Sequence, residues 1–428
     1  MSPTQPVGDP LPGMGELPAQ VAASAPDGSE RPFSVYLHVP YCRVRCGYCD
    51  FNTYTNLAMG QGASAEDFVG TLAGELRAAR RAMDEAGLPV RAAQTVFVGG
   101  GTPTMLPAAD LVSMLELVRE CFGLAADAEV TTEANPDSVD EAGLAALAEG
   151  GFTRVSFGMQ SAVPHVLKVL ERTHKPARVP RVVDWARRAG LSTSLDLIYG
   201  APGESLEDWQ HSLDAVTRIG PDHVSAYALV IEEGTRMWGQ VRRGELPMPE
   251  DDDEATKYEM ADAALSQAGY ECYEISNWAR PGSECRHNQA YWLDWDWWGA
   301  GPGAHSHLGD VRLWNTKHPV AWAGQIATGH LPVAGHEVID VGSRELERIM
   351  LGIRLREGIE LASLGNRPDC PSAERPDAGR ATPPHLVPVV AGLVADGLLD
   401  AAAALRGRAV LTLRGRLMAD TVTRALTQ

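Results

Sequence analysis

Six short apolar runs alternate with helical segments over the first half of the chain, and this alternation limits the folds that are open to it. We expect strands at residues 35–39, 95–98, 129–133, 154–157, 192–198 and 223–229. Strands that alternate with helices of about ten to fifteen residues are typical of a parallel sheet or barrel. Right-handed crossovers would roll six such units into a cylinder that lacks the last two of eight. We therefore predict an α/β fold with a partial (β/α)6 barrel of the TIM type.

Three cysteines follow the first predicted strand in a C-x3-C-x2-C array. Cys42, Cys46 and Cys49 lie close enough along one loop to hold an iron–sulfur cube, for which four thiolates are the usual complement. The residue two positions after Cys49 is Phe51, so one iron would stay open to a small molecule. The alternatives are a structural zinc site, which needs four ligands, or reduced thiols in the core.

Polar residues and glycines recur where the predicted strands end, which is where ligands bind in a parallel barrel. Carboxylates there can accept hydrogen bonds from hydroxyls or an ammonium group, and glycines let a ligand approach the backbone. The residues that we single out are Tyr36, Gly100, Gly101, Thr102, Glu133, Gln160, Arg172 and Asp196. Such a set is complementary to a ribose and an amino acid. Taken singly, the two glycines can be only a tight turn, and Asp196 with Arg172 only a structural ion pair.

Six stretches of the sequence resemble a known family. The segments are VYLHVPYCRVRCGYCDFNTY, VFVGGGTPT, TEANPD, SFGMQS, ERTHKP and LDLIYGAPGE. Together they resemble the oxygen-independent coproporphyrinogen III oxidase-like branch of the radical S-adenosylmethionine (SAM) superfamily, from about residue 32 to beyond residue 355. The resemblance implies a [4Fe-4S] cluster on the three cysteines and SAM on the open iron. It also implies that Tyr48 stacks on the adenine and that the strand-end residues named above contact SAM.

Two features distinguish between the branches of this family. The true oxidases resemble C-x3-C-x2-C-x-C, whereas Phe51 and the segment HNQAYW at residues 287–292 resemble the haem chaperone branch. In that segment His287 offers an imidazole nitrogen to haem iron, and Cys285 is a second candidate ligand. The flat apolar surface for a macrocycle would come from Tyr291, Trp292, Trp295, Trp297 and Trp298. The alternative is that this aromatic segment only covers the barrel and that His287 is a core histidine with satisfied hydrogen bonds.

Composition restricts the partners. A net charge of −19 argues against nucleic acid and against adhesion to anionic lipid, because both need clustered lysine and arginine. Seven cysteines, no signal peptide pattern and no run of ~20 apolar residues together predict a cytoplasmic protein. We expect haem and an unidentified acceptor protein as partners. Membrane contact is expected only transiently, through that acceptor, and a homodimer is a further candidate state.

The chain divides into five predicted parts. We expect a disordered segment at residues 1–31, the radical SAM barrel at 32–245 and, at 246–365, a region of the oxidase type that carries the aromatic segment. A Pro- and Asp-rich linker at 366–384 would precede a winged-helix-like module at 385–428, within an α+β C-terminal region. For that module we favour packing onto the barrel over DNA binding, because it has no basic stripe.

The function that these features favour is a haem chaperone built on a radical SAM barrel, to which we assign no catalytic residue. The rival is an oxygen-independent coproporphyrinogen III oxidase, in which a radical from SAM decarboxylates propionate side chains to give protoporphyrinogen IX. A winged-helix regulator that uses the cluster as a redox sensor is a third, weaker hypothesis, since it depends only on the C-terminal outline.

Overall fold

The computed structural model describes residues 8–13, 15–24, 28–365 and 382–427. All six predicted strands are present, and each is parallel to the next, as expected. They are β1 (Phe33–Val39), β2 (Ala93–Gly100), β3 (Leu124–Ala134), β4 (Arg154–Gln160), β5 (Ser192–Tyr199) and β6 (His223–Ala228). Most residues of β1 are buried whichever side they face, as in a parallel sheet that is covered on both sides.

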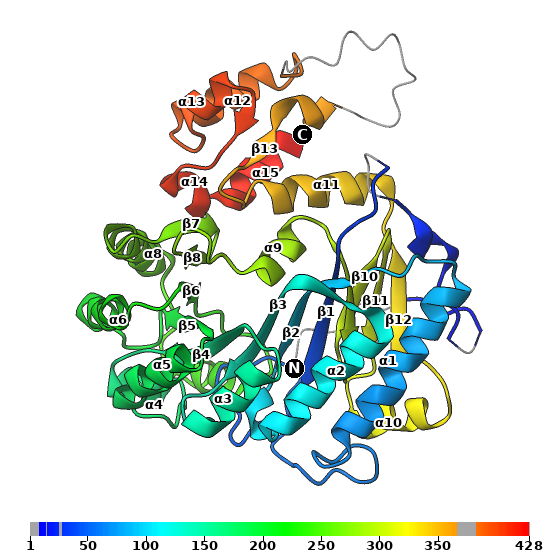
Figure 1. Ribbon diagram of the computed structural model, residues 1–428. Coiled ribbons are helices and arrows are strands. Elements are labelled where there is room, and N and C mark those ends of the chain that lie inside the picture. Colours follow the sequence, from blue (N-terminus) through cyan, green and yellow to red (C-terminus); the bar gives the residue numbers. More distant parts are fainter. Residues whose placement is uncertain (1–7, 14, 25–27, 366–381, 428) are drawn as a thin grey trace, which may run out of the picture.

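Helices cover the outer side of these strands (Figure 1). They are α1 (Phe68–Glu85), α2 (Ala108–Phe122), α3 (Glu141–Glu149), α4 (Pro164–Val169), α5 (Val179–Arg188) and α6 (Leu206–Ile219). Helix α1 forms where the sequence repeats apolar residues at helical spacing, and Phe68, Leu72 and Leu76 are fully buried against the sheet. Helix α6 begins at a capping box between Ser205 and Asp208.

The sheet continues beyond the six parallel strands on both sides. The added strands are β7 (Glu271–Glu274), β8 (Asn277–Ala279), β9 (Asp296–Ala300), β10 (His305–Leu308), β11 (Val311–Asn315) and β12 (Val333–Val338). The full order is β12-β11-β10-β9-β1-β2-β3-β4-β5-β6-β8-β7. Strands β1 and β6 therefore do not pair with each other, and the barrel stays open. Among the added strands only β9 runs parallel to its neighbour in the first half, β1.

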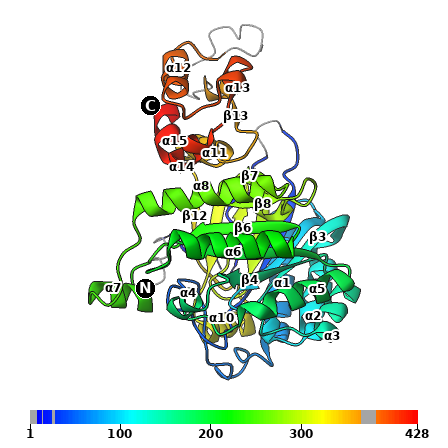
Figure 2. The ribbon, with the colours of Figure 1, turned by 90° about the vertical axis from the view of Figure 1, so that its left-hand side faces the viewer.

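The remaining helices lie around the opening and beyond it. They are α7 (Arg236–Arg242), α8 (Asp251–Gln267), α9 (Arg286–Trp292), α10 (Pro319–Ala327) and α11 (Val341–Gly352). Short 3-10 turns occur at η1 (Ala19–Ala22), η2 (Pro103–Met105), η3 (Pro176–Arg178) and η4 (Leu361–Gly365). Helix α8 lies beside α6 (Figure 2). None of the helices in the described ranges is long and apolar enough to cross a membrane.

The disorder predicted for residues 1–31 is wrong for most of the described part of that segment. The backbone of Asp9 pairs with that of His336 on β12, and Leu17 and Val21 are buried in the main hydrophobic core. Composition alone missed this segment because its few apolar side chains are buried against residues that lie some three hundred positions later. Residues 1–7, 14 and 25–27 lie outside the described ranges.

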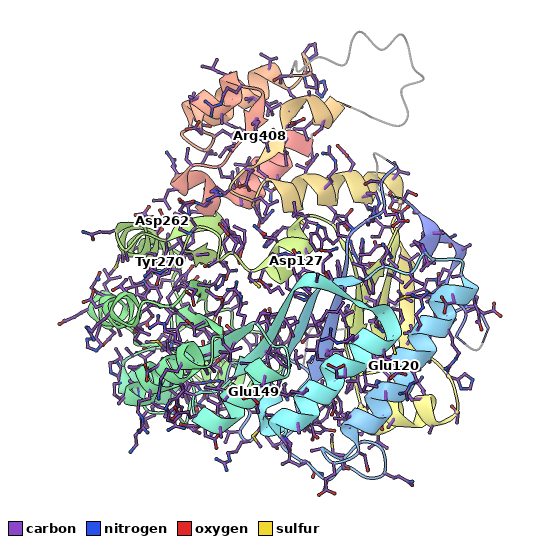
Figure 3. All side chains as sticks on the ribbon, in the orientation of Figure 1. Glu120, Asp127, Glu149, Asp262, Tyr270 and Arg408 are labelled. Carbon is purple, nitrogen blue, oxygen red and sulfur yellow. The ribbon has the colours of Figure 1, made fainter. Side chains whose placement is uncertain are left out.

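The C-terminal residues form a separate group of helices with its own small core (Figures 1 and 2). Its elements are α12 (Val387–Ala395), α13 (Ala401–Leu405), β14 (Arg408–Ala409), α14 (Leu413–Leu417) and α15 (Ala419–Thr427). Strand β14 pairs with β13 (Ile359–Glu360), which precedes the predicted linker. Arg416 binds Asp262 of α8 at 2.8 Å and so ties the module to the barrel; Figure 3 shows Asp262 on the barrel and Arg408 within the module. Residues 366–381 of the predicted linker lie outside the described ranges.

Candidate functional site

One cavity of about 670 Å³ opens at the carboxyl ends of β1 to β6 and reaches into the barrel. Its size is that of a pocket for one small-molecule ligand. The residues predicted for the cluster and SAM line it together with His287, namely Tyr36, Cys42, Cys46, Tyr48, Cys49, Gly100, Gly101, Thr102, Glu133, Gln160, Arg172, Asp196 and His287. The four tryptophans predicted as a surface for the macrocycle, Trp292, Trp295, Trp297 and Trp298, do not line it. The structure thus brings together predicted residues from β1 to β5, the loops that follow these strands, and α9, while β6 adds Ser225 and Tyr227 to the lining.

The three cysteines lie on the loop that follows β1. The backbone N–H of Cys42 donates to the carbonyl of Tyr54 at 2.9 Å, and that of Cys49 donates to the carbonyl of Cys46 at 3.1 Å. Burial raises the pKa of Cys42 to about 11 and also raises that of Cys49. A raised pKa favours the protonated thiol at Cys42 and Cys49, and metal coordination would replace these protons.

Asn52 fixes this loop to the far side of the sheet. Its Nδ2 donates to the carbonyl of Pro302 at 2.9 Å and to that of Lys317 at 2.8 Å, and its Oδ1 accepts from the Tyr54 hydroxyl at 3.2 Å. From below, Nε2 of His38 contacts the carbonyl of Asn52 at 3.0 Å. Because a carbonyl only accepts, this nitrogen carries the proton, and Nδ1 accepts from the Tyr36 hydroxyl at 3.0 Å. The cysteine loop is therefore held independently of any bound group.

Arg172 is the cation nearest to the thiols. Its Nη1 lies 3.3 Å from Cys46 Sγ, and its Nη2 donates to the carbonyl of Gly158 at 3.0 Å and to the side chain of Asn135. Next to the carbonyl of Gly158, β4 is interrupted by a bulge between Gly158 and Gln160, and Gln160 has a left-handed φ of 60°. A guanidinium here stabilises negative charge on the cysteine loop.

The two glycines after β2 are required by packing beneath the loop. Gly100 has φ of +110°, and a Cβ there would lie 2.6 Å from the ring of His38. A Cβ on Gly101 would lie 2.5 Å from the carbonyl oxygen of Tyr41, whose loop pairs with this turn.

Two buried carboxyls face the interior of the cavity. Burial, with a contribution from the nearby Asp196, raises the pKa of Glu133 to about 8. Burial also raises the pKa of Asp196 to about 6, although Ser156 donates to its carboxylate at 2.9 Å. Oε2 of Glu133 accepts from the Gly100 N–H at 3.1 Å. Each carboxyl group can lose its proton when a ligand binds, and its carboxylate can then accept a hydrogen bond from an ammonium or hydroxyl group of that ligand.

The donor set fits a cluster with an open iron better than it fits zinc. A structural zinc site needs four ligands, and in the described ranges no further His, Cys, Asp or Glu side chain forms a metal-binding group with the three cysteines. The cysteines would hold a [4Fe-4S] cluster. Glu133 and Asp196 could accept hydrogen bonds from the ammonium and ribose hydroxyls of SAM, and Arg172 could pair with its carboxylate. Thr131 adds a buried hydroxyl that lines the cavity without a hydrogen-bond partner.

His287 lies at the floor of the cavity, on helix α9, which contacts the start of β2. Thr95 donates to Ser34 and so accepts from Nδ1 of His287, at 2.7 Å. Nε2 of His287 then accepts from the Tyr291 hydroxyl at 3.0 Å, and the ring stacks on Phe97. Burial lowers the pKa of His287 to about 3. This geometry is that of a core histidine with satisfied hydrogen bonds, the alternative to an iron ligand. Neither ring nitrogen is free to bind iron.

Most of the aromatic segment that includes α9 is also packed. Trp298 is fully buried, and Trp297 stacks on His307 and donates to the carbonyl of His305 at 3.0 Å. Cys285 is buried at 3.4 Å from the carboxylate of Glu129, and burial raises the pKa of its thiol. This segment therefore closes the lower end of the barrel, and Figure 3 marks Asp127, to which Arg286 of α9 binds.

Sequence reasoning missed two residues that shape the site. Asn52 stands inside the cysteine segment and Asn135 inside TEANPD, so both lay in stretches already singled out. An asparagine side chain within a ligand loop was the available signal, since it can hold backbone groups of distant segments.

Comparisons with known proteins agree with this site. Residues 36–216 match the radical SAM superfamily. The heme chaperone HemW of Mycobacterium tuberculosis is 47% identical over 418 residues, which cover 97% of each chain. The heme chaperone HemW of a Synechocystis species is 34% identical, with 78% of this chain and 80% of the relative covered. The solved structure of coproporphyrinogen III oxidase HemN from Escherichia coli superposes with a TM-score of 0.77 over 96% of this chain and 92% of that one, at 24% identity, and so supports the fold.

Proposed function

We propose that this chain, which belongs to the HemW family of the radical SAM superfamily, is a haem chaperone that binds haem and passes it to an acceptor protein. The observation that carries the proposal is the 47% identity to a HemW protein over almost the full length of both chains. Phe51 agrees with it, since it stands where the oxidase-like pattern has a fourth cysteine.

Each part of the site has a role in this proposal. Cys42, Cys46 and Cys49 would hold a [4Fe-4S] cluster, and Arg172, whose Nη1 lies 3.3 Å from Cys46 Sγ, would stabilise negative charge on these ligands. Glu133 and Asp196 bind the polar groups of SAM, while Tyr48, which packs against an apolar cluster below the opening, contacts its adenine. When bound together, a cluster and SAM supply redox and radical chemistry to a site. In a chaperone the same residues serve to bind and orient.

Three finer points belong to the same proposal. We place the protein in the cytoplasm, because the described cysteines are all free thiols, which a reducing compartment preserves. Contact with a membrane would occur only through the acceptor, since the net charge of −19 repels anionic lipid. Pairing of two copies is the third point, and sedimentation of the protein with and without its cluster tests it.

The rival oxidase activity is tested directly under anaerobic conditions. Reconstituted, reduced protein is incubated with coproporphyrinogen III and SAM, and protoporphyrinogen is measured by its fluorescence after oxidation. The proposal predicts no product above a control without protein, while a parallel haem titration gives saturable binding. Product formed at a catalytic rate would make the oxidase the better description.

A further inference from the structure

The opening of the cavity carries a group of apolar side chains that the functions assigned above do not use. Val44 and Phe51 on the cysteine loop are 45% and 57% exposed, and Tyr227 and Val230 at the end of β6 and beyond it are 42% and 65% exposed. All four line the same cavity. We call them the mouth residues. Exposed apolar side chains that are gathered at one pocket mark a binding surface.

The mouth residues come from opposite sides of the barrel. The loop after β1 supplies one pair, and the end of β6 with the following loop supplies the other, five strands away in the sheet. The two sides touch where the N–H of Met237 in α7 donates to the carbonyl of Gly47 at 2.8 Å. The apolar groups thus lie on two sides of the cavity opening, an arrangement that suits a flat molecule.

The cysteine loop also carries two exposed arginines, of which Arg45 lies next to Phe51. Arg43 and Arg45 flank Val44 and are exposed, and neither pairs with a carboxylate in the part of the chain that the structure describes. Nη2 of Arg45 lies 3.3 Å from the carbonyl of Cys49 and 3.5 Å from that of Phe51. Asp50 and Glu232 also line the cavity, so the charge around its mouth is uneven.

The floor of the cavity offers no comparable place. His287 is 1% exposed, and both of its ring nitrogens are hydrogen-bonded. Thr95, its partner, stands five residues before Gly100 on β2, so the floor lies about 16 Å below the cysteine loop. A ligand bound at the strand ends, such as SAM, would lie between this floor and the cavity opening.

We infer that haem binds at the mouth of the cavity, with its macrocycle between Phe51 and Val44 on one side and Tyr227 and Val230 on the other. Its propionates face the arginine side and turn away from Glu232. Aromatic and aliphatic side chains bind the apolar ring system, and guanidinium groups bind the two carboxylates. This inference rests on the proposed haem-binding function. It moves the haem site from the HNQAYW segment to the cysteine loop.

The test is a haem titration of anaerobically reconstituted protein, followed by absorbance, with cluster content checked in every variant. Phe51→Asp and Val230→Asp should each raise the Kd for haem by about tenfold or more, because each puts a carboxylate against the macrocycle. Leu405→Asp is the matched control, since Leu405 is 90% exposed on α13 in the C-terminal module. Its Kd should equal that of the wild type. His287→Gln should stay within about twofold of the wild type.

Arg45→Glu tests the contribution of the arginine charge to haem binding, and a second ligand shows whether the variant is still folded. It should weaken binding of haem but leave binding of haem dimethyl ester, which lacks the charged propionates, unchanged. Mouth variants that bind haem as the wild type does, together with loss of binding in His287→Gln, would overturn the inference and leave the chaperone function intact. A wild type without saturable haem binding would instead overturn the proposed function itself.

Discussion

Asn52→Ala is the substitution that most directly tests how the cysteine loop is positioned. It removes the donors to Pro302 and Lys317 and the acceptor for the Tyr54 hydroxyl. A neutral hydrogen bond contributes about 1 kcal/mol net, so the loss of three should favour loop opening by about 2–4 kcal/mol. At 1.4 kcal/mol per factor of ten, this corresponds to roughly a 30- to 1000-fold increase in the opening equilibrium.

The assay is hydrogen exchange of the cluster-free protein, read by mass spectrometry on peptides that cover residues 42–54. Exchange at Cys42 and Tyr54, whose amides donate within the loop, should accelerate by about this factor. Iron bound per chain after anaerobic reconstitution should fall as well, because the thiols are no longer held in place.

Asn56→Ala is the matched control on the same loop. The side chain of Asn56 is exposed and only accepts from the N–H of Ala58 at 3.0 Å, so this variant should exchange and bind iron as the wild type does. If Asn52→Ala kept wild-type exchange and iron content, the claim that the loop is positioned before the cluster binds would be refuted.

Three other predictions concern the cluster and two buried carboxyls. Cys42→Ala, purified without air, should lose the visible absorption of the cluster, and a full cluster in this variant would contradict the ligand set. The raised pKa of Glu133, about 8 against an ordinary 4.5, means that the folded protein binds more protons than the unfolded chain between these values, so stability falls as pH rises through that window. In urea unfolding, the free energy of unfolding of Glu133→Gln relative to that of the wild type should therefore rise by about 1–3 kcal/mol from pH 5.5 to pH 7.5. If this difference did not change with pH, the raised pKa of Glu133 would be contradicted. Glu75→Ala removes the acceptor of the buried N–H groups of Gly301 and Trp322 and one of the acceptors of Asn315 Nδ2, and should lower the free energy of unfolding by about 3–5 kcal/mol, whereas Glu75→Gln should cost clearly less in the same assay.

The parallel half of the sheet was predictable from the sequence because its strands are apolar runs separated by amphipathic helices such as α1. The added strands were not, since each has only three to six residues and most of them lie in an aromatic stretch without regular alternation, for example β8 (Asn277–Ala279). Such short strands are stabilised by pairing with a neighbouring strand, and the local sequence pattern contains no information about that neighbour.

The candidate site divides in the same way. Cysteine spacing and strand ends predicted the residues that line the cavity, because backbone topology alone places them at one edge. The carbonyls of Pro302 and Lys317 that Asn52 binds, and the Thr95 hydroxyl that His287 binds, lie 192 to 265 residues away along the chain, so no local pattern reveals these contacts. The imidazole of His287 suggested an iron ligand for a chemical reason, whereas in the structure both of its ring nitrogens are hydrogen-bonded, to Thr95 and Tyr291.

The most direct test of the central claim is a Mössbauer spectrum of protein reconstituted anaerobically with ⁵⁷Fe, recorded without and with SAM. Three thiolate ligands and an open iron predict a [4Fe-4S] cluster in which one iron site changes its spectrum when SAM is added. A spectrum that SAM leaves unchanged, or a protein that takes up zinc in place of iron at these cysteines, would contradict the account.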